Sequence, residues 1–266
     1  YPKTGESNSK VSVLTFDIKS KVTRQVKLPL ETGGYIPRII PTQDANKLAI
    51  VTLNRQQNRL DLYFADPRST VCKLAIRDES DTYISENTFD NIKFYPENFS
   101  FLSEKSGFNH LYWYTMGGNL VRQVTSGNYE VKEFLGWDGA ENAFYYTSNE
   151  GSPLQQATYK IDRKGKKIKL SSQTGTNNVQ FSTDMKYFMN RYTNLQTPLI
   201  ITLNDNTGKV LTTLVTNEKL KQKLSQYDIP QKEFFTFQTA DGTTLNGWMM
   251  KPSGFSSTKK YPVLMY

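Results

Sequence analysis

The sequence contains one cysteine and one histidine, Cys72 and His110, among 266 residues. A lone cysteine cannot form an internal disulfide, and together these two residues cannot fill a tetrahedral zinc shell. A single histidine leaves one possible base for a Ser–His–Asp triad, and His110 lies inside an apolar run that predicts a strand. We therefore interpret His110 as structural, and we predict no metal, no cofactor and no catalytic residue in this chain.

Three longer patterns are also missing. No apolar run approaches the roughly 20 residues that a membrane-spanning helix needs. The N-terminus has no signal-peptide pattern. No G-x-S-x-G motif is present, so no serine occupies the strand-to-helix elbow of a hydrolase nucleophile.

Charge is unbalanced, with a net value of +8. The densest basic run surrounds Gly165 and comprises Arg163, Lys164, Lys166, Lys167 and Lys169. The run is short and no nucleic-acid-binding module accompanies it, so we predict a solvated hairpin turn and no nucleic-acid partner. Asp78, Glu79 and Asp81 form an acidic cluster whose spacing allows a hard cation. The ligand and glycine pattern of a calcium loop is missing, which favours a solvated loop.

Aromatic residues are abundant, at 13% of the chain, and they occur in short runs. The clearest example is the stretch 99–127, where apolar runs at 99–103, 108–115 and 120–125 are separated by polar turns. Aromatic and β-branched runs bounded by Gly, Asn and Ser are typical of an antiparallel meander. The sequence therefore predicts an all-β fold in this region.

The same layout repeats along the chain. Apolar strands enter polar turns at Asp17, Asp66, Thr115, Asp162 and Asn204, with a period in the forties. About four strands per unit of that length are typical of propeller blades, whereas a sandwich or barrel gives no reason for so long a period. We predict a partial β-propeller of about four to five blades over residues 1–215.

The pattern changes after residue 215. Residues 216–226 have leucines at helical spacing, and we assign 216–232 as a helical linker. Two further strands, 233–238 and 245–251, flank a turn, and the apolar run 261–266 predicts a strand buried on both faces. Residues 233–266 are therefore predicted to be the truncated start of an α/β domain, with the natural polypeptide continuing beyond them.

Several stretches carry a resemblance to a known family. They are YPKTGESNSKVSV at 1–13, SEKSGFNHLYWY at 103–114 followed by QVTSGNYEV at 123–131, and TADGTTLNGWMMKPSGF at 239–255 with KKYPVLMY at 259–266. At these residues the chain resembles the dipeptidyl peptidase IV family of the prolyl oligopeptidase clan of serine peptidases. The last pair of stretches is the most specific, because it couples a propeller to the first strands of a hydrolase sheet.

The resemblance implies an eight-bladed propeller above an α/β-hydrolase domain with a Ser–Asp–His triad, releasing N-terminal X-Pro or X-Ala dipeptides. It also implies a periplasmic or secreted homodimer. This chain would be the second half of the propeller and the start of the hydrolase domain, with no peptidase activity of its own. The family's double-glutamate motif is absent here, and its oxyanion tyrosine is expected just after Tyr266.

Several residues remain open from the sequence alone. Trp113, Trp137 and Trp248 are interpreted as packing residues, and the sequon at Asn98 as a chance match. Arg122 and Arg191 could face a central cavity, although the sequence cannot orient them. The alternative function is a non-enzymatic propeller that binds a peptide or glycan. It predicts a closed ring in which residues 11–18 pair with a strand near residue 210.

Overall fold

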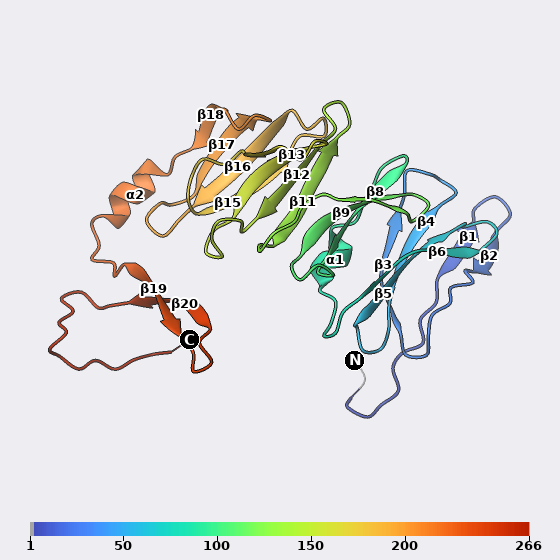
Figure 1. Cartoon of the computed structure of the whole chain (residues 1–266), viewed down its shortest axis with the longest axis horizontal. Coiled ribbons are helices and arrows are strands. Elements are labelled where there is room, and N and C mark those ends of the chain that lie inside the picture. Colours follow the sequence, from blue (N-terminus) through green and yellow to red (C-terminus); the bar gives the residue numbers. More distant parts are fainter. Residues whose placement is uncertain (1–2, 266) are drawn as a thin grey trace.

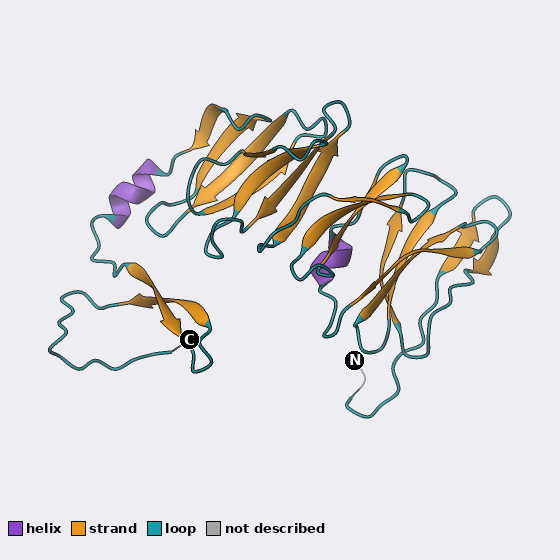
Figure 2. Cartoon of the chain, viewed as in Figure 1, coloured by secondary structure: helices purple, strands orange, loops and turns teal. Residues whose placement is uncertain are grey.

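The computed structural model describes residues 3–265, and its regular structure is almost entirely β-strand (Figures 1 and 2). Four antiparallel sheets of four strands follow one another along the chain. The first contains β3 (Tyr35–Pro41), β4 (Leu48–Leu53), β5 (Arg59–Ala65) and β6 (Cys72–Glu79). The second contains β7 (Lys93–Phe94), β8 (Asn98–Ser103), β9 (His110–Thr115) and β10 (Leu120–Gln123).

The third and fourth sheets have the same order of strands. The third contains β11 (Val131–Asp138), β12 (Ala143–Ser148), β13 (Ala157–Asp162) and β14 (Lys167–Lys169). The fourth contains β15 (Thr176–Phe181), β16 (Tyr187–Thr193), β17 (Ile200–Asp205) and β18 (Val210–Val215). Each sheet is a simple meander in which consecutive strands are hydrogen-bonded neighbours. The predicted partial propeller is therefore confirmed.

The repeated polar turns mark one position in every unit. Asp66, Thr115, Asp162 and Asn204 lie at or beside the turn that joins the third strand of a sheet to its fourth. Asp17 ends the first strand of a separate hairpin, β1 (Leu14–Asp17) and β2 (Val22–Gln25). This hairpin therefore corresponds to the outer half of a further blade.

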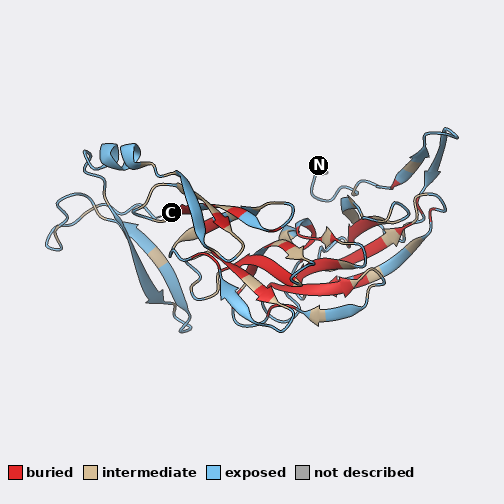
Figure 3. Cartoon of the chain, turned by 90° about the horizontal axis from the view of Figure 1, so that it is seen from above, coloured by how far each residue is buried: buried red, intermediate tan, exposed pale blue. Residues whose placement is uncertain are grey.

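Apolar side chains are buried mainly between neighbouring sheets rather than within one sheet. Phe99 and Phe101 of the second sheet pack with Leu60 and Leu62 of the first, and Trp113 packs with Phe144 of the third. The middle strands β4, β8, β9 and β12 are nearly buried throughout. β8, β9 and β12 lie between two sheets, and the outer face of β4 is covered by Val13 and Val26. Figure 3 shows the buried residues gathered in the strands of the sheets. Stacking of blades thus supplies the core.

The sheets converge at their first strands. β11 lies against β8 and β9 of the preceding sheet and against β15 of the following one. The fourth strands β10, β14 and β18 lie at the opposite edges of their sheets. Such wedge packing places first strands around the centre of a propeller.

In the described part of the chain the sheets form an open arc. β1 pairs with β2 and not with a strand near residue 210, which contradicts the closure required by the binding-propeller alternative.

The C-terminal region follows helix α2 (Glu218–Leu224) and contains the hairpin β19 (Lys232–Gln238) and β20 (Thr244–Met250), drawn apart from the four sheets in Figure 1. The predicted strand 261–266 is not formed in residues 261–265, and Tyr266 lies outside the described residues. Leu264 is 96% exposed. A strand buried on both faces needs partner strands and covering helices, and the described chain supplies neither. The boundaries at 215 and 232 remain predictions.

Two local features differ from the sequence-based expectation. Helix α1 (Glu86–Asp90) was not predicted, because it has one turn and too few residues for a helical period; Ser85 caps it by accepting from the backbone N–H of Asn87. Asp78 and Glu79 were expected in a loop but end strand β6. The ladder to Leu60 and Arg59 of β5 continues through both residues and overrides their low strand propensity.

Candidate functional site

A cleft of about 330 Å³ opens where the first strands of three sheets converge. Its walls come from β7 and the turn after it, from β11, and from β15 and the turn after it. The residues that define this cleft are Lys93, Tyr95, Glu133, Trp137, Gln180 and Phe181. Because first strands surround the centre of a propeller, this cleft lies at the inner edge of the arc of sheets.

Tyr95 and Trp137 form the aromatic wall. Their ring centroids are 5.3 Å apart in an edge-to-face arrangement, and the ring of Trp113 lies 5.2 Å from that of Tyr95. The backbone N–H of Trp137 donates to the Tyr95 hydroxyl oxygen at 3.1 Å. Burial raises the pKa of Tyr95 to about 12, so the hydroxyl keeps its proton at neutral pH. The wall is rigid and still presents a hydrogen-bond donor.

Lys93 supplies the cation at the edge of the cleft. Its Nζ donates to the carbonyl oxygen of Leu135 at 2.7 Å and lies 5.7 Å from the ring centroid of Phe134. Burial lowers the pKa of Lys93, and the nearby carboxylate of Glu133 opposes that effect. One of three N–H groups is thus engaged within the described chain, and the other two remain available.

The cleft therefore combines an aromatic wall with hydrogen-bond donors, and its charges nearly cancel. These properties suit binding and orientation of a neutral polar ligand. Among the described residues, no group of three or more His, Cys, Asp or Glu is placed to hold a metal ion.

His110 has both ring nitrogens engaged by the protein. Nε2 lies 2.9 Å from the carbonyl oxygen of Gly127, so Nε2 must carry the proton and donate. Nδ1 lies 3.1 Å from the hydroxyl of Thr125, which donates to it, and the ring packs edge-to-face on Tyr129. His110 is 1% exposed. This arrangement supports the structural interpretation and leaves no nitrogen free to act as a base.

Acidification should weaken the fold through this residue. Burial lowers the pKa of His110, so the unfolded chain takes up a proton before the folded chain does. The free energy of unfolding should therefore fall as pH drops below about 6.5, the ordinary pKa of histidine. Urea unfolding at pH 7.5 and pH 5 measures this loss, which should be smaller in His110→Asn. Equal losses in both proteins would show that folding does not shift the pKa of His110.

The three residues of the acidic cluster, Asp78, Glu79 and Asp81, have different environments in the structure. Asp78 is 7% exposed, and Ser103 of the next sheet donates to its carboxylate at 2.8 Å. Burial raises the pKa of Asp78. Glu79 and Asp81 are exposed and line a small polar pocket with Glu104. Asp78 thus joins the two sheets through a hydrogen bond.

Of the two arginines considered for the central cavity, Arg122 lies on the outer edge of its sheet. Arg122 is on the outermost strand β10 and donates to the carbonyl oxygens of Asp162 and Arg163, at 3.3 and 2.7 Å. It therefore fastens the basic β13–β14 turn to the second sheet. Arg191 is on β16 and is exposed. The alternation of apolar and polar residues along β10 and β16 could be predicted from the sequence, but the distance of each strand from the propeller axis could not.

The remaining candidates have structural contacts. Trp113 is buried and Trp137 packs against it, although Trp137 also lines the cleft. Trp248 is 49% exposed, so the packing expected for it is not found within the described chain. The side-chain amide of Asn98 donates to the carbonyl oxygen of Tyr114. Burial raises the pKa of the Cys72 thiol, which makes it a poor nucleophile.

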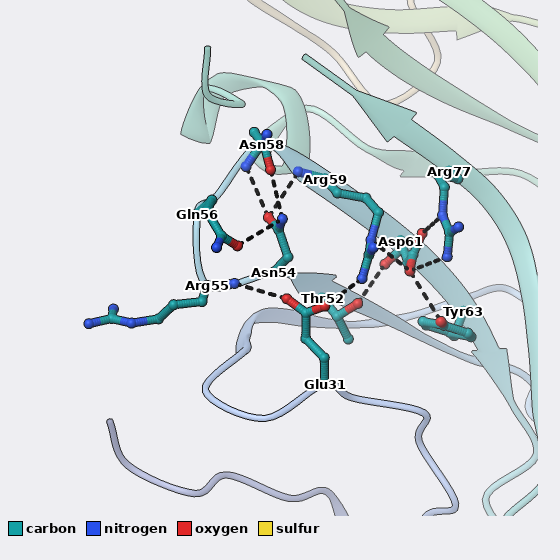
Figure 4. Close-up of polar contacts among 10 residues, drawn as sticks. All are labelled: Glu31, Thr52, Asn54, Arg55, Gln56, Asn58, Arg59, Asp61, Tyr63 and Arg77. Carbon is teal, nitrogen blue, oxygen red and sulfur yellow. Dashed lines mark hydrogen bonds and ion pairs between the residues drawn. The ribbon is translucent and has the colours of Figure 1, made fainter. Parts of the chain in front are cut away.

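A second polar cluster lies on the first sheet (Figure 4). The carboxylate of Asp61 accepts from Nε and Nη2 of Arg77 at 2.6 and 3.0 Å and from the Tyr63 hydroxyl at 3.2 Å. Arg59 reaches Glu31, in the segment before β3, at 2.7 Å. Each carboxylate faces an arginine, so this cluster ties the incoming chain to the sheet.

Comparison of the sequence with known proteins identifies the family to which the chain belongs. The model of the dipeptidyl peptidase IV (DPP IV) N-terminal region matches residues 1–199. The chain belongs to this family. A probable dipeptidyl peptidase 4 of Aspergillus flavus is 25% identical over 283 residues, which cover 99% of this chain and 36% of that protein. Dipeptidyl peptidase 4 of Trichophyton rubrum is likewise 25% identical and is covered to 36%. The chain thus spans about a third of the length of these relatives.

Solved structures agree with the family and the fold. The crystal structure of Porphyromonas gingivalis dipeptidyl peptidase 4 matches 98% of this DPP IV-family chain with a TM-score of 0.94 and 39% identity, and 37% of that structure is covered. A Bacteroides ovatus structure matches with a TM-score of 0.85 at 23% identity, which supports the fold alone. No helix among residues 3–265 is long and apolar enough to cross a membrane.

Proposed function

We propose that this chain is the substrate-channel part of a serine dipeptidyl peptidase that releases X-Pro or X-Ala dipeptides from peptide N-termini. The observation that carries the proposal is the match of nearly the whole chain to the P. gingivalis dipeptidyl peptidase 4 structure at 39% identity. The family match over residues 1–199 supports the same enzyme class.

The role proposed for this chain is positioning. In a serine peptidase the serine attacks the peptide carbonyl after histidine accepts its proton, and the resulting acyl-enzyme is hydrolysed. The stacked sheets would enclose that reaction and admit only an extended chain end. Holding the peptide at a fixed distance from the nucleophile converts binding into a large effective concentration. The cleft lined by Lys93 and Trp137 would be one place where the chain holds the peptide.

The chain by itself is proposed to be inactive. His110 is its only histidine, and both ring nitrogens are hydrogen-bonded inside the second sheet. Residues 216–232 would form the linker, and residues 233–266 would form the first part of a hydrolase domain, with the triad supplied by other residues of that domain. Export to the periplasm or medium and assembly as a homodimer belong to the same proposal.

The test compares the purified 266-residue chain with the product of the complete reading frame that encodes it. We expect the complete product to hydrolyse glycyl-prolyl-p-nitroanilide and the 266-residue chain to release no p-nitroaniline. The N-acetylated substrate is the matched control, because a dipeptidyl peptidase needs the free amino terminus. A complete product that leaves the free dipeptide substrate intact would refute the proposed activity. Hydrolysis by the 266-residue chain would refute its proposed inactivity.

A further inference from the structure

We propose that the cleft between β7, β11 and β15 binds the substrate beyond the released dipeptide. It would hold one apolar side chain against Trp137 and bind peptide carbonyl oxygens through donors on Lys93 and Tyr95. The proposal rests on the proposed function for the statement that the ligand is a peptide.

The position of the cleft supports this role. Three consecutive sheets contribute to it, and each contributes its first strand or the turn after that strand. The volume of about 330 Å³ falls at the lower end of the range of small-ligand sites. A peptide held along the inner edge of the arc would meet this cleft.

The polar side of the cleft consists of donors held in place. Lys93 is fixed by its bond to the carbonyl oxygen of Leu135, and Tyr95 is fixed by the N–H of Trp137. Both engaged groups keep at least one further hydrogen to donate. Carbonyl oxygens are the matching acceptors, and an extended peptide presents them at regular intervals. The carboxylate of Glu133 nearly balances Lys93, which favours neutral backbone over an acidic side chain.

The apolar side of the cleft is equally well fixed. Trp137 is half-buried, its Nε1 donates to Asn142 at 3.2 Å, and its ring lies 5.5 Å from that of Trp113. Phe181 of β15 and the buried Met185 complete the wall, and Met185 lies over Gly136, where no side chain intervenes. An aromatic surface that does not have to reorganise binds an apolar side chain at low entropic cost.

Isothermal titration calorimetry with the 266-residue chain tests the site without requiring activity. The probes are two hexapeptides, Gly-Pro-Gly-Leu-Phe-Gly and Gly-Pro-Gly-Gly-Gly-Gly. We expect saturable binding of the first, with at least tenfold weaker binding of the second. Lys93→Met should weaken binding of the first about tenfold, because it removes a charged donor and retains an apolar stem. Trp137→Phe should bind nearly as tightly as the wild type, and Trp137→Ala should not.

Lys132→Met is the matched control for Lys93→Met, since Lys132 is an exposed lysine on β11, the strand that carries Trp137, and lies outside the cleft. Near-ultraviolet circular dichroism confirms that each variant is folded. Absence of saturable binding by the wild type, or equal weakening by Lys132→Met and Lys93→Met, would overturn the site. Failure of the proposed function is a separate result, because it is read from p-nitroaniline release by the complete product.

Discussion

Replacing Gly118 with alanine should lower the free energy of unfolding by about 2–5 kcal/mol. Gly118 lies in the β9–β10 turn with a φ of +86°, and a β-carbon built there would lie 2.1 Å from the carbonyl oxygen of Ala75. Ala75 belongs to β6, so the turn of one sheet rests directly on the backbone of the preceding sheet. Neither backbone can move aside without opening the space between the sheets. Urea unfolding monitored by tryptophan fluorescence measures the loss.

Gly107→Ala is the matched control for that experiment. Gly107 also has a positive φ, +98°, but a β-carbon there would meet nothing within 4 Å. Only the cost of the left-handed backbone, about 1–2 kcal/mol, should remain. Equal losses for the two variants would mean that close contact between the sheets contributes nothing. The close approach of a turn glycine to a neighbouring backbone, seen at Gly118, also occurs at Gly208, where a β-carbon would lie 2.5 Å from the carbonyl oxygen of Leu170.

Phe99→Ala should cost about 3–5 kcal/mol, the range for removing a fully buried phenylalanine ring. Phe99 is 0% exposed and stacks on Tyr114 at 5.4 Å. Its ring also contacts Phe94 at 5.6 Å and Phe64 of the neighbouring sheet at 5.9 Å. The truncated side chain leaves a cavity between two sheets that rigid strands cannot close. Thermal and urea unfolding of the purified variant test this.

Phe16→Ala provides the comparison, because Phe16 lies on the β1–β2 hairpin and is 57% exposed. Its loss should change stability by less than about 0.5 kcal/mol, as is usual for surface positions. If both variants lost the same stability, burial between the sheets would not be the main source of the core energy.

The repeat was predictable from the sequence because turn chemistry and strand length are local properties. Polar residues at Asp66 and Asp162 end strands of similar length, and the fold keeps both turns at the same place in the unit. Helix α1 and the conformation of residues 261–265 were not predictable in this way. A one-turn helix has no period to detect, and a strand buried on both faces needs partner strands and covering helices, which the described residues do not supply to 261–265.

The candidate cleft was missed because it depends on spacing between sheets. Lys93 and Trp137 are 44 positions apart in the numbering and come together only because equivalent strands of successive blades converge. The repeat itself was the available signal, since residues at matching positions of successive first strands must lie near one another. Arg122 shows the converse, because its position on a fourth strand places it far from the axis.

We propose above that this chain is the propeller part of a serine dipeptidyl peptidase. Sequencing the source gene beyond the codon for Tyr266 tests it most directly. We expect an open frame that continues into a G-x-S-x-G elbow, followed by an aspartate and a histidine in that order. A stop codon directly after Tyr266, or a continuation without the elbow, would contradict the claim.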